Sequence, residues 1–324
     1  MRAVRIHEDG GPEVLVVEEV PDPTPAAGEV LIALRAASLN HLDVWLRQGL
    51  PSVPKPRILG ADGAGTVAAL GEGVTGFAQG DRVLLNPGLD DGARIVGEHM
   101  DGTHAELIAV PAEYVHPIPD GLSFEEAAAF PLVFATAYRM LSTRAGLQEG
   151  EWVLVWGVGS GVGTASLAVA KALGGRVLAT STDDAKLDGA LELGADAVVR
   201  TDADVVAKAR ELTDGAGMDI VVEHIGEATW KSSLQVARAG GRIVVCGATS
   251  GPNPPAQLHR IFWKQLSILG STMGTREDFA AVLDLVATGR ARPVVDRVFP
   301  LDEVRAAHEH LEAGAQLGKV VLRI

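Results

Sequence analysis

Four glycines, Gly157, Gly159, Gly161 and Gly163, stand directly after the apolar run 152–156. A helical pattern with small residues on one face follows over 164–173, and a second apolar run covers 177–180. A strand, a glycine turn, a helix and a strand within about 30 residues form the βαβ unit that binds a dinucleotide. Glycines let the backbone approach a pyrophosphate closely, and the amides at the helix start point at its negative charge.

The spacing in this loop departs from Gly-x-Gly-x-x-Gly, because Val162 occupies the third glycine position counted from Gly157. A loop one residue longer places Gly157, Gly161 and Gly163 at the three positions where the backbone must come close to the ligand. Glycine turns without a nucleotide are common, but the strand–helix alternation continues to about residue 275 and favours the dinucleotide interpretation. The loop residues expected to contact a cofactor are Gly157, Gly159, Ser160, Gly161, Val162 and Gly163.

The elements that must position this loop belong to a regular alternation that begins at Glu151. Six strands in two βαβαβ halves predict a doubly wound α/β fold with a parallel sheet. A further amphipathic helix is expected over 276–288. The predicted strands cover 152–156, 177–180, 197–199, 219–223, 242–246 and 266–270, with helices near 161–173, 184–193, 203–213 and 228–238.

Residues 1 to about 120 follow a different pattern, with short strand-like runs separated by glycine and proline turns. This pattern predicts a compact antiparallel barrel, interrupted by one helical segment over 40–48 that Asn40 can cap. Ser123 and Glu126 form a predicted capping box before the crossover to the second domain. Two more strands are expected at 294–299 and 319–324, around a helix that begins near 301–302.

Composition narrows the functional classes. The chain has 324 residues, of which 47% are hydrophobic and 22% charged, which is typical of a globular protein with two domains. A net charge of -14 argues against binding to nucleic acid or to an acidic membrane surface. No apolar run is long enough for a membrane span, and the N-terminus lacks a signal core. A single cysteine, Cys246, excludes an internal disulfide and favours the cytoplasm.

Seven segments, spread over nearly the full length of the chain, follow the order of one protein family. They are GEVLIALRAASLNHLDVWLRQG, ILGADGAGTVAALGEGVTGFAQGDRV, AAAFPLVFATAYRML, the glycine loop, GGRIVVCGATSG, SILGSTM and GKVVLRI. With these segments the chain resembles the medium-chain dehydrogenase/reductase family. The resemblance implies a GroES-like β-barrel catalytic domain over 1–121 and 273–324, with a dinucleotide-binding Rossmann domain over 122–272. It also implies hydride transfer with a nicotinamide cofactor bound between the domains.

The family's zinc branch needs three protein ligands at a catalytic metal. Its first ligand, a cysteine, matches Asn40, its second, a histidine, matches Ala61, and its third falls near Leu132. The four-cysteine lobe that binds structural zinc is also missing between Leu89 and Glu98. We therefore expect no zinc. A different metal site remains an alternative, and its candidate ligands are His41, Asp43, Asp62, His99 and His104.

Without a metal there is no Lewis acid to stabilise an alkoxide, so alcohol oxidation becomes difficult. Reduction of a conjugated carbonyl is easier, because the hydride goes to carbon and the charge spreads onto a distant oxygen that one donor can stabilise. Zinc-free relatives that resemble this chain include quinone oxidoreductases and enone or enoyl reductases. Asn40 is the expected catalytic residue, as a donor to the substrate oxygen or an anchor of the nicotinamide ribose. Helix capping is the competing interpretation.

The preference for NAD or NADP depends on the residues at the end of the second strand of the nucleotide-binding domain. NAD-binding proteins usually have an acidic residue there. Ser181 and Thr182 stand there instead, and Lys186 follows one helical turn later. These three residues favour NADPH, although the neighbouring Asp183 and Asp184 would repel a 2′-phosphate and leave NAD as an alternative.

The family match implies further contacts. His41 and Lys319 match basic residues near the pyrophosphate, and the alternatives are an exposed helix residue and a surface strand charge. Flat aromatic side chains are candidates for an apolar substrate pocket, or else for core or interface: Trp45, Phe130 and Trp263. The remaining expected cofactor contacts are Thr136, Ile225, Gly226, Gly247, Ala248, Met273 and Gly274.

The last strand of the predicted sheet, 266–271, is an apolar edge that invites pairing with a second copy, so a homodimer is expected. Three functional classes follow from the sequence. The first is a zinc-independent NADPH-dependent reductase of quinones or activated alkenes, which we favour. The second is an alcohol dehydrogenase with or without an atypical metal site. The third is an NADPH-binding regulatory or structural protein without turnover.

Overall fold

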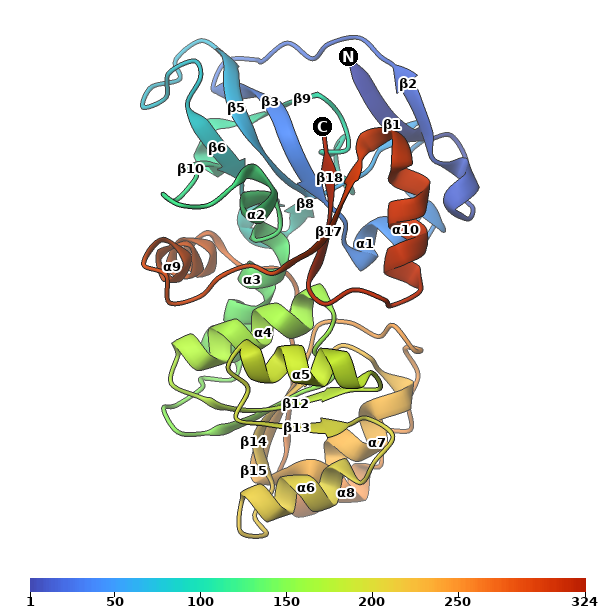
Figure 1. Ribbon diagram of the computed structural model, residues 1–324, viewed down its shortest axis with the longest axis vertical. Coiled ribbons are helices and arrows are strands. Elements are labelled where there is room, and N and C mark those ends of the chain that lie inside the picture. Colours follow the sequence, from blue (N-terminus) through green and yellow to red (C-terminus); the bar gives the residue numbers. More distant parts are fainter. The chain divides into compact units, whose positions relative to one another are not determined.

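Strands and helices alternate through the middle of the chain and build one parallel sheet (Figure 1). The computed structural model describes residues 1–324. All five strand pairs of this sheet are parallel, and the spatial order is β13-β12-β11-β14-β15-β16. The strands are β11 (Trp152–Val155), β12 (Arg176–Ser181), β13 (Ala197–Arg200), β14 (Met218–Glu223), β15 (Ala237–Val245) and β16 (Ser267–Gly270). The order confirms the predicted doubly wound sheet.

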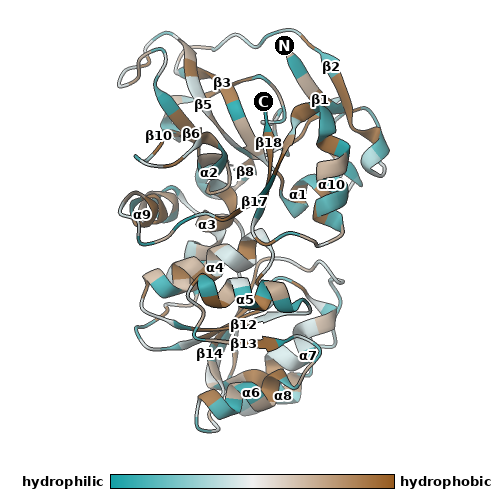
Figure 2. Cartoon of the chain, in the orientation of Figure 1, coloured by the Kyte–Doolittle hydropathy of each residue, from teal (hydrophilic) through white to brown (hydrophobic).

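Several helices of this part begin at a residue whose side chain caps the first turn. Ser160, Asp183 and Asp204 each accept a hydrogen bond from a backbone amide in the first turn of α4, α5 and α6. The strands around β13 carry mainly hydrophobic residues (Figure 2). The helices are α3 (Pro131–Tyr138), a π-helical segment (Arg139–Arg144), α4 (Gly161–Ala172), α5 (Asp184–Glu192), α6 (Val205–Leu212), α7 (Glu227–Val236), α8 (Leu258–Lys264) and α9 (Arg276–Ala287).

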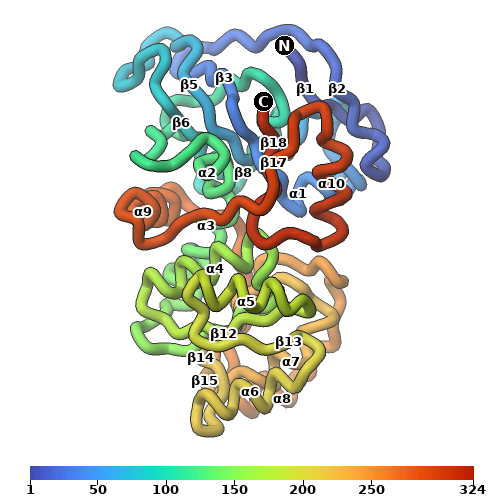
Figure 3. The backbone as a smooth tube through the Cα atoms, viewed as in Figure 1, coloured from blue at the N-terminus to red at the C-terminus, as the bar shows by residue number.

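The two ends of the chain build a second, mainly antiparallel sheet of seven strands, with the order β10-β6-β5-β3-β18-β17 and with β9 also paired to β3. Here the C-terminal strand β18 lies beside the N-terminal strand β3, as the red and blue segments of Figure 3 show. A smaller sheet has the order β2-β1-β4, and β7 pairs with β8. The strands are β1 (Arg2–Ile6), β2 (Val16–Glu19), β3 (Glu29–Ser38), β4 (Arg57–Ile58), β5 (Asp62–Leu70), β6 (Arg82–Leu85), β7 (Gly88–Leu89), β8 (Arg94–Ile95), β9 (Leu107–Pro111), β10 (Val115–Pro117), β17 (Val295–Pro300) and β18 (Lys319–Arg323).

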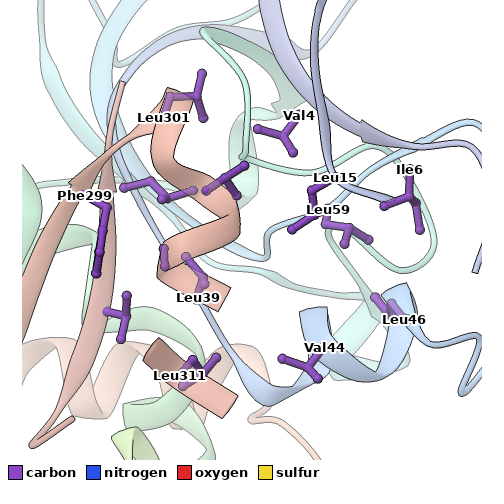
Figure 4. Close-up of a cluster of buried hydrophobic side chains, with 14 of the residues drawn as sticks. Val4, Ile6, Leu15, Leu39, Val44, Leu46, Leu59, Phe299, Leu301 and Leu311 are labelled. Carbon is purple, nitrogen blue, oxygen red and sulfur yellow. The ribbon is translucent and has the colours of Figure 1, made fainter. Parts of the chain in front are cut away.

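Three helices complete this part: α1 (His41–Arg47), α2 (Phe124–Ala128) and α10 (Val304–Glu312). The capping box at α2 is confirmed, because Ser123 Oγ accepts from the Glu126 amide while Glu126 accepts from the Ser123 amide. Side chains from β1, α1, α10 and β18 share one hydrophobic core (Figure 4). This core joins residues that are nearly 300 positions apart in the sequence, such as Ile6 and Leu301.

The chain divides into two units, which we call the barrel unit (1–132 and 293–324) and the sheet unit (133–292). The expected boundaries were 121/122 and 272/273, so 122–132 lies with the barrel unit and 273–292 with the sheet unit. Helix α9 is held in the sheet unit by Asp278, which accepts hydrogen bonds from Arg139 and Thr143. No helix of the chain is long and apolar enough to span a membrane.

Candidate functional site

The sheet unit gathers most of the expected cofactor residues at one edge. Parallel strands end at the same side of a sheet, so the turns after β11, β12, β14 and β15 lie together. The winding reverses between β11 and β14, which is the switch point where doubly wound sheets bind their ligand. The residues that follow these four strands are the glycine loop, Ser181 with Thr182, Ile225 with Gly226, and Gly247 with Ala248.

The glycine loop has the geometry of a cradle for a phosphate group. Gly157 has φ +55°, which a side chain would strain, and a Cβ on Gly163 would lie 2.5 Å from the Gly157 carbonyl oxygen. Ser160 caps α4 by accepting from the Gly163 amide, which leaves the first-turn amides of Gly161 and Val162 to bind an anion. The loop therefore fits the pyrophosphate of a nicotinamide dinucleotide.

A buried carboxylate, which the sequence analysis missed, shapes the turn after β14. Glu223 accepts hydrogen bonds from the Ile225 and Gly226 amides at 2.9 and 3.0 Å. It also accepts from the Thr229 and Ser233 hydroxyls at the start and middle of α7. Glu223 is fully buried, so these donors compensate for the loss of water around its charge. The result is a rigid turn that presents Ile225 and Gly226 at the sheet edge.

The neighbouring His224 lies directly under the glycine loop. Its Nε2 donates to the Trp156 carbonyl at 2.8 Å, which leaves Nδ1 as the acceptor of the neutral ring. A Cβ on Gly157 would meet the His224 ring at 3.5 Å. Burial lowers the pKa of His224, so the ring is neutral at physiological pH.

Charged groups surround the expected adenosine end of the cofactor. Ser181 is the Cα partner of Arg200 on β13, and its hydroxyl accepts from the Asp183 amide at 3.1 Å. Arg200 donates to Asp202 and to Asp184, and these hydrogen bonds raise the pKa of the guanidinium. The sequence analysis missed Arg200, although its signal is simple: it is the basic residue that ends the strand next to Ser181.

The remaining expected cofactor residues of the sheet unit lie in two places. Thr136 is buried in α3, and Gly274 packs against Ala135 of that helix. Met273 is buried and adopts a positive φ of 49° just before α9. Trp263, a candidate for the substrate pocket, is 85% exposed on α8, so it belongs neither to the core nor to an enclosed pocket of the sheet unit.

The barrel unit holds a buried cluster of polar and charged side chains, which we call the Asn40 cluster: Ser38, Asn40, Asp43, Asp62 and Lys319. Lys319 donates to Asn40 Oδ1 at 2.5 Å and to Asp62 Oδ2 at 3.1 Å. Asn40 Nδ2 donates to the same Asp62 oxygen at 2.9 Å. The exposed fractions of Asn40, Asp62 and Lys319 are 6%, 0% and 3%, so Lys319 is not the surface charge that one interpretation expected.

The other atoms of Asp62 are also engaged. Its Oδ1 accepts from the Leu132 amide at 2.8 Å, and its Oδ2 accepts from the Ser38 hydroxyl at 3.2 Å. Asp62 thus joins β3, β5, β18 and the start of α3 through one carboxylate. Buried charges are tolerated when they are paired and hydrogen-bonded, as they are here.

Asn40 occupies the N-cap position of α1, as one interpretation expected, with φ -126° and ψ 157°. Its side-chain amide is nevertheless directed to Asp62 and Lys319, while its backbone amide donates to Asp43 at 2.7 Å. Asp43 also accepts from the Gly60 amide at 2.9 Å. Burial raises the pKa of Asp43 to about 7, against the opposing effects of these donors and of Lys319.

Aromatic and histidine residues near the Asn40 cluster have different surroundings. His41 begins α1 and lies beside Trp45, with ring centroids 6.3 Å apart, and both residues are half-buried. Phe130 is fully buried. His104 and His308 are fully buried and meet edge to face at 6.2 Å, and burial lowers the pKa of His104 to about 4 and that of His308 well below its ordinary value.

The donor set of the Asn40 cluster does not suit zinc. Zinc prefers thiolate, imidazole and carboxylate ligands. The three positions that match the zinc ligands of the family instead hold the Asn40 amide, the Ala61 methyl and the Leu132 side chain. Asp62 is the carboxylate that contacts the side chains of both Asn40 and Lys319. It is already paired with the Lys319 ammonium, and this positive charge would repel a metal cation. No group of three or more His, Cys, Asp or Glu side chains in the chain could hold a metal ion, so the alternative ligand set of His41, Asp43, Asp62, His99 and His104 does not assemble.

Comparisons with known proteins agree with this two-part architecture. Residues 26–120 match the family model described as alcohol dehydrogenase GroES-like domain, and residues 161–288 match the model described as zinc-binding dehydrogenase. The chain is 36% identical to an acryloyl-coenzyme A reductase of Metallosphaera sedula, over 94% of this chain and 95% of that protein. It is 34% identical to a quinone oxidoreductase of Lama guanicoe, over 99% and 97%.

A solved structure titled NAD-dependent alcohol dehydrogenase superposes with a TM-score of 0.97 and 44% sequence identity, over 100% of both chains. The names of these relatives describe oxidoreductases that act on different substrates. The substrate must therefore be argued from this chain's own residues.

Proposed function

Because the chain belongs to the medium-chain dehydrogenase/reductase superfamily, and is therefore an oxidoreductase that uses a nicotinamide cofactor, we propose that it is a zinc-independent reductase of quinones or activated alkenes. One observation carries this proposal: the positions that match the zinc ligands hold an amide, a methyl and a leucine side chain, and a buried ammonium contacts the amide. The names of the acryloyl-coenzyme A reductase and quinone oxidoreductase relatives support the same substrate class.

The proposed chemistry needs only what the Asn40 cluster offers. A nicotinamide cofactor, when bound, would supply a hydride to the β-carbon of the substrate, and the displaced electron pair would move to the conjugated oxygen. Asn40 donates a hydrogen bond to that oxygen and stabilises its negative charge. A proton from solvent completes the reduction. The sheet-edge residues and the α4 amides would hold the cofactor's pyrophosphate.

For the cofactor we propose NADPH, with Ser181, Thr182 and Lys186 at the 2′-phosphate. Arg200 supports this proposal, because its guanidinium lies on the strand next to Ser181. Asp184 and Asp202 compete for that guanidinium and limit the preference over NADH. A preference for NADH of about tenfold or more in Kd, which corresponds to about 1.4 kcal/mol, would contradict the proposal.

The test is cofactor oxidation by the purified protein against a panel of a quinone, an α,β-unsaturated ketone and an α,β-unsaturated coenzyme A thioester. Metal content is measured on the same sample, and each assay is repeated with a chelator. We expect turnover with at least one acceptor, no stoichiometric metal and no effect of the chelator. Tight NADPH binding without turnover on any acceptor would support a binding protein instead.

Alcohol dehydrogenation is the second candidate, because the solved relative at 44% identity is described as an NAD-dependent alcohol dehydrogenase. It predicts oxidation of small alcohols with NAD or NADP, at rates above those for the unsaturated acceptors. A stoichiometric metal whose removal abolishes that oxidation would replace our proposal with this one.

We also propose that two copies associate through the outer edge of the sheet. Strand β16 is an edge strand, and Ile268 on it is 38% exposed. Leu258, Phe262 and Trp263 on the nearby α8 are 66–85% exposed, which is unusual for side chains of this size. Light scattering should give twice the chain mass of 33.8 kDa, and a clean monomer would contradict the proposal.

A further inference from the structure

The orientation of the Asn40 amide is decided by its two partners. Lysine can only donate hydrogen bonds and an ionised carboxylate can only accept them. The atom that faces Lys319 must therefore be Oδ1, and the atom that faces Asp62 must be Nδ2. An asparagine amide is often ambiguous between its two orientations, but here the charges on both sides permit one.

This arrangement leaves one N–H of Asn40 uncommitted. The amide nitrogen carries two hydrogens, and the one directed to Asp62 is used. At the same time Lys319 donates to Oδ1 at 2.5 Å, a short charge-assisted hydrogen bond that draws electron density from the amide. In a buried chain of hydrogen bonds, each bond polarises the next and strengthens it. The remaining N–H of Asn40 is therefore a stronger donor than an isolated amide.

We propose that Lys319 is the positioning residue of the reaction: through Asn40, it supplies the positive charge that a metal supplies in zinc-containing enzymes. The inference rests on the proposed function, because it takes Asn40 as the donor to the substrate oxygen. It differs from the role that the family match implies for Lys319, which is contact with the cofactor's pyrophosphate. The two roles predict different kinetics.

A double-mutant cycle separates them. Asn40→Ala removes the donor and should lower kcat about 100-fold. Lys319→Met removes the polarising charge and should lower kcat about tenfold, with the Kd for NADPH within about threefold of wild type, as expected when only transition-state stabilisation is lost. The variant with both substitutions should match Asn40→Ala within about threefold, because Lys319 has nothing to act on once the amide is gone.

Two controls keep the cycle interpretable. Lys55→Met removes another lysine of the barrel unit that contacts a carboxylate and a carbonyl, Asp9 and Val53, and it should leave kcat unchanged. If Lys319→Met does not fold, Lys319→Met with Asp62→Leu removes both buried charges and takes its place. Fold is checked by the unfolding midpoint and by NADPH binding.

The outcomes are distinct. An active wild type with unchanged kcat in the folded Lys319 variant overturns the inference alone. If Lys319→Met raises the Kd for NADPH about tenfold and leaves kcat unchanged, the pyrophosphate role replaces the inference. The inference is also overturned if the decreases in kcat of the two single variants multiply in the double variant. A wild type that reduces no acceptor of the panel overturns the proposed function and the inference with it.

Discussion

The glycine loop of the sheet unit and the Asn40 cluster of the barrel unit are two candidate sites that differ in the groups they offer to a ligand. The loop binds through the backbone, with glycines that admit no side chain and amides at a helix start. The Asn40 cluster is made of side chains from β3, β5, β18, α1 and the residue before α1. A backbone site depends on a few local residue types and tolerates other changes nearby. A side-chain site changes its chemistry with one substitution, as the Asn40 and Ala61 positions show.

The largest expected effect comes from removing the anion of the Asn40 cluster. Asp62→Asn leaves the Lys319 ammonium buried without a charge partner, which should lower the free energy of unfolding by about 3 kcal/mol. Asp62→Leu with Lys319→Met should lose much less, because no uncompensated charge remains. Urea unfolding measures both. Equal losses in the two variants would show that packing, not charge, holds this cluster together.

A smaller effect tests the backbone site. In Gly163→Ala the added Cβ would lie 2.5 Å from the Gly157 carbonyl oxygen, and such overpacking costs about 1–3 kcal/mol. We expect the Kd for NADPH to rise about tenfold or more, measured by nicotinamide fluorescence. Gly270→Ala, at the end of β16, is the matched control, because nothing lies within 4 Å of the added methyl. A normal Kd in Gly163→Ala would exclude the loop as the pyrophosphate site.

The barrel unit should also respond to pH in two opposing ways. His104 stays neutral when folded, with a pKa of about 4 instead of 6.5, so stability falls by about 1.4 kcal/mol per pH unit as the pH drops from 6.5 towards 4. Asp43 holds its proton up to about pH 7 instead of 3.8, so its contribution is present at low pH and is lost as the pH rises to about 7.

These two contributions nearly cancel in the wild type between pH 4 and 6.5, and the substitutions His104→Phe and Asp43→Asn should separate them. His104→Phe should make stability less sensitive to acid by about 1.4 kcal/mol per pH unit, while Asp43→Asn should make it more sensitive by a similar amount. Urea unfolding at pH 5 and pH 6 measures the slopes. Unchanged slopes in both variants would contradict the burial of these groups.

The smallest expected effect concerns cofactor choice. Asp184→Asn frees Arg200 from one of its two acidic partners, and exposed pairs of this kind are weak. The Kd for NADPH should fall about threefold, with a smaller change for NADH. Asp188→Asn, an exposed acid on the same helix without a contact to Arg200, is the control. An equal gain in both variants would indicate general electrostatics and no specific role for Arg200.

Much of the sheet unit could be predicted, because its signals are local. The six strands lie within a few residues of their predicted ranges. Gly157 has the positive φ, and Gly163 the close backbone approach, that the loop requires. The short helix α8, whose local signal is weak, was missed, and the π-helical geometry of segment 139–144 was not predicted. Arg200 was missed because its relevance depends on the strand that pairs with it, not on its neighbours in the sequence.

In the barrel unit, the sequence by itself determined the β-rich character, the cap position of Asn40 and the absence of cysteine and histidine at the matched ligand positions. Only the tertiary structure decided that Lys319, 279 residues from Asn40, donates to its amide, and that Asp62 contacts both. The physical reason is burial: a lysine at the surface and a lysine paired in the interior look alike in sequence. Their energetics differ only once the strands β3, β5 and β18 have brought their partners together.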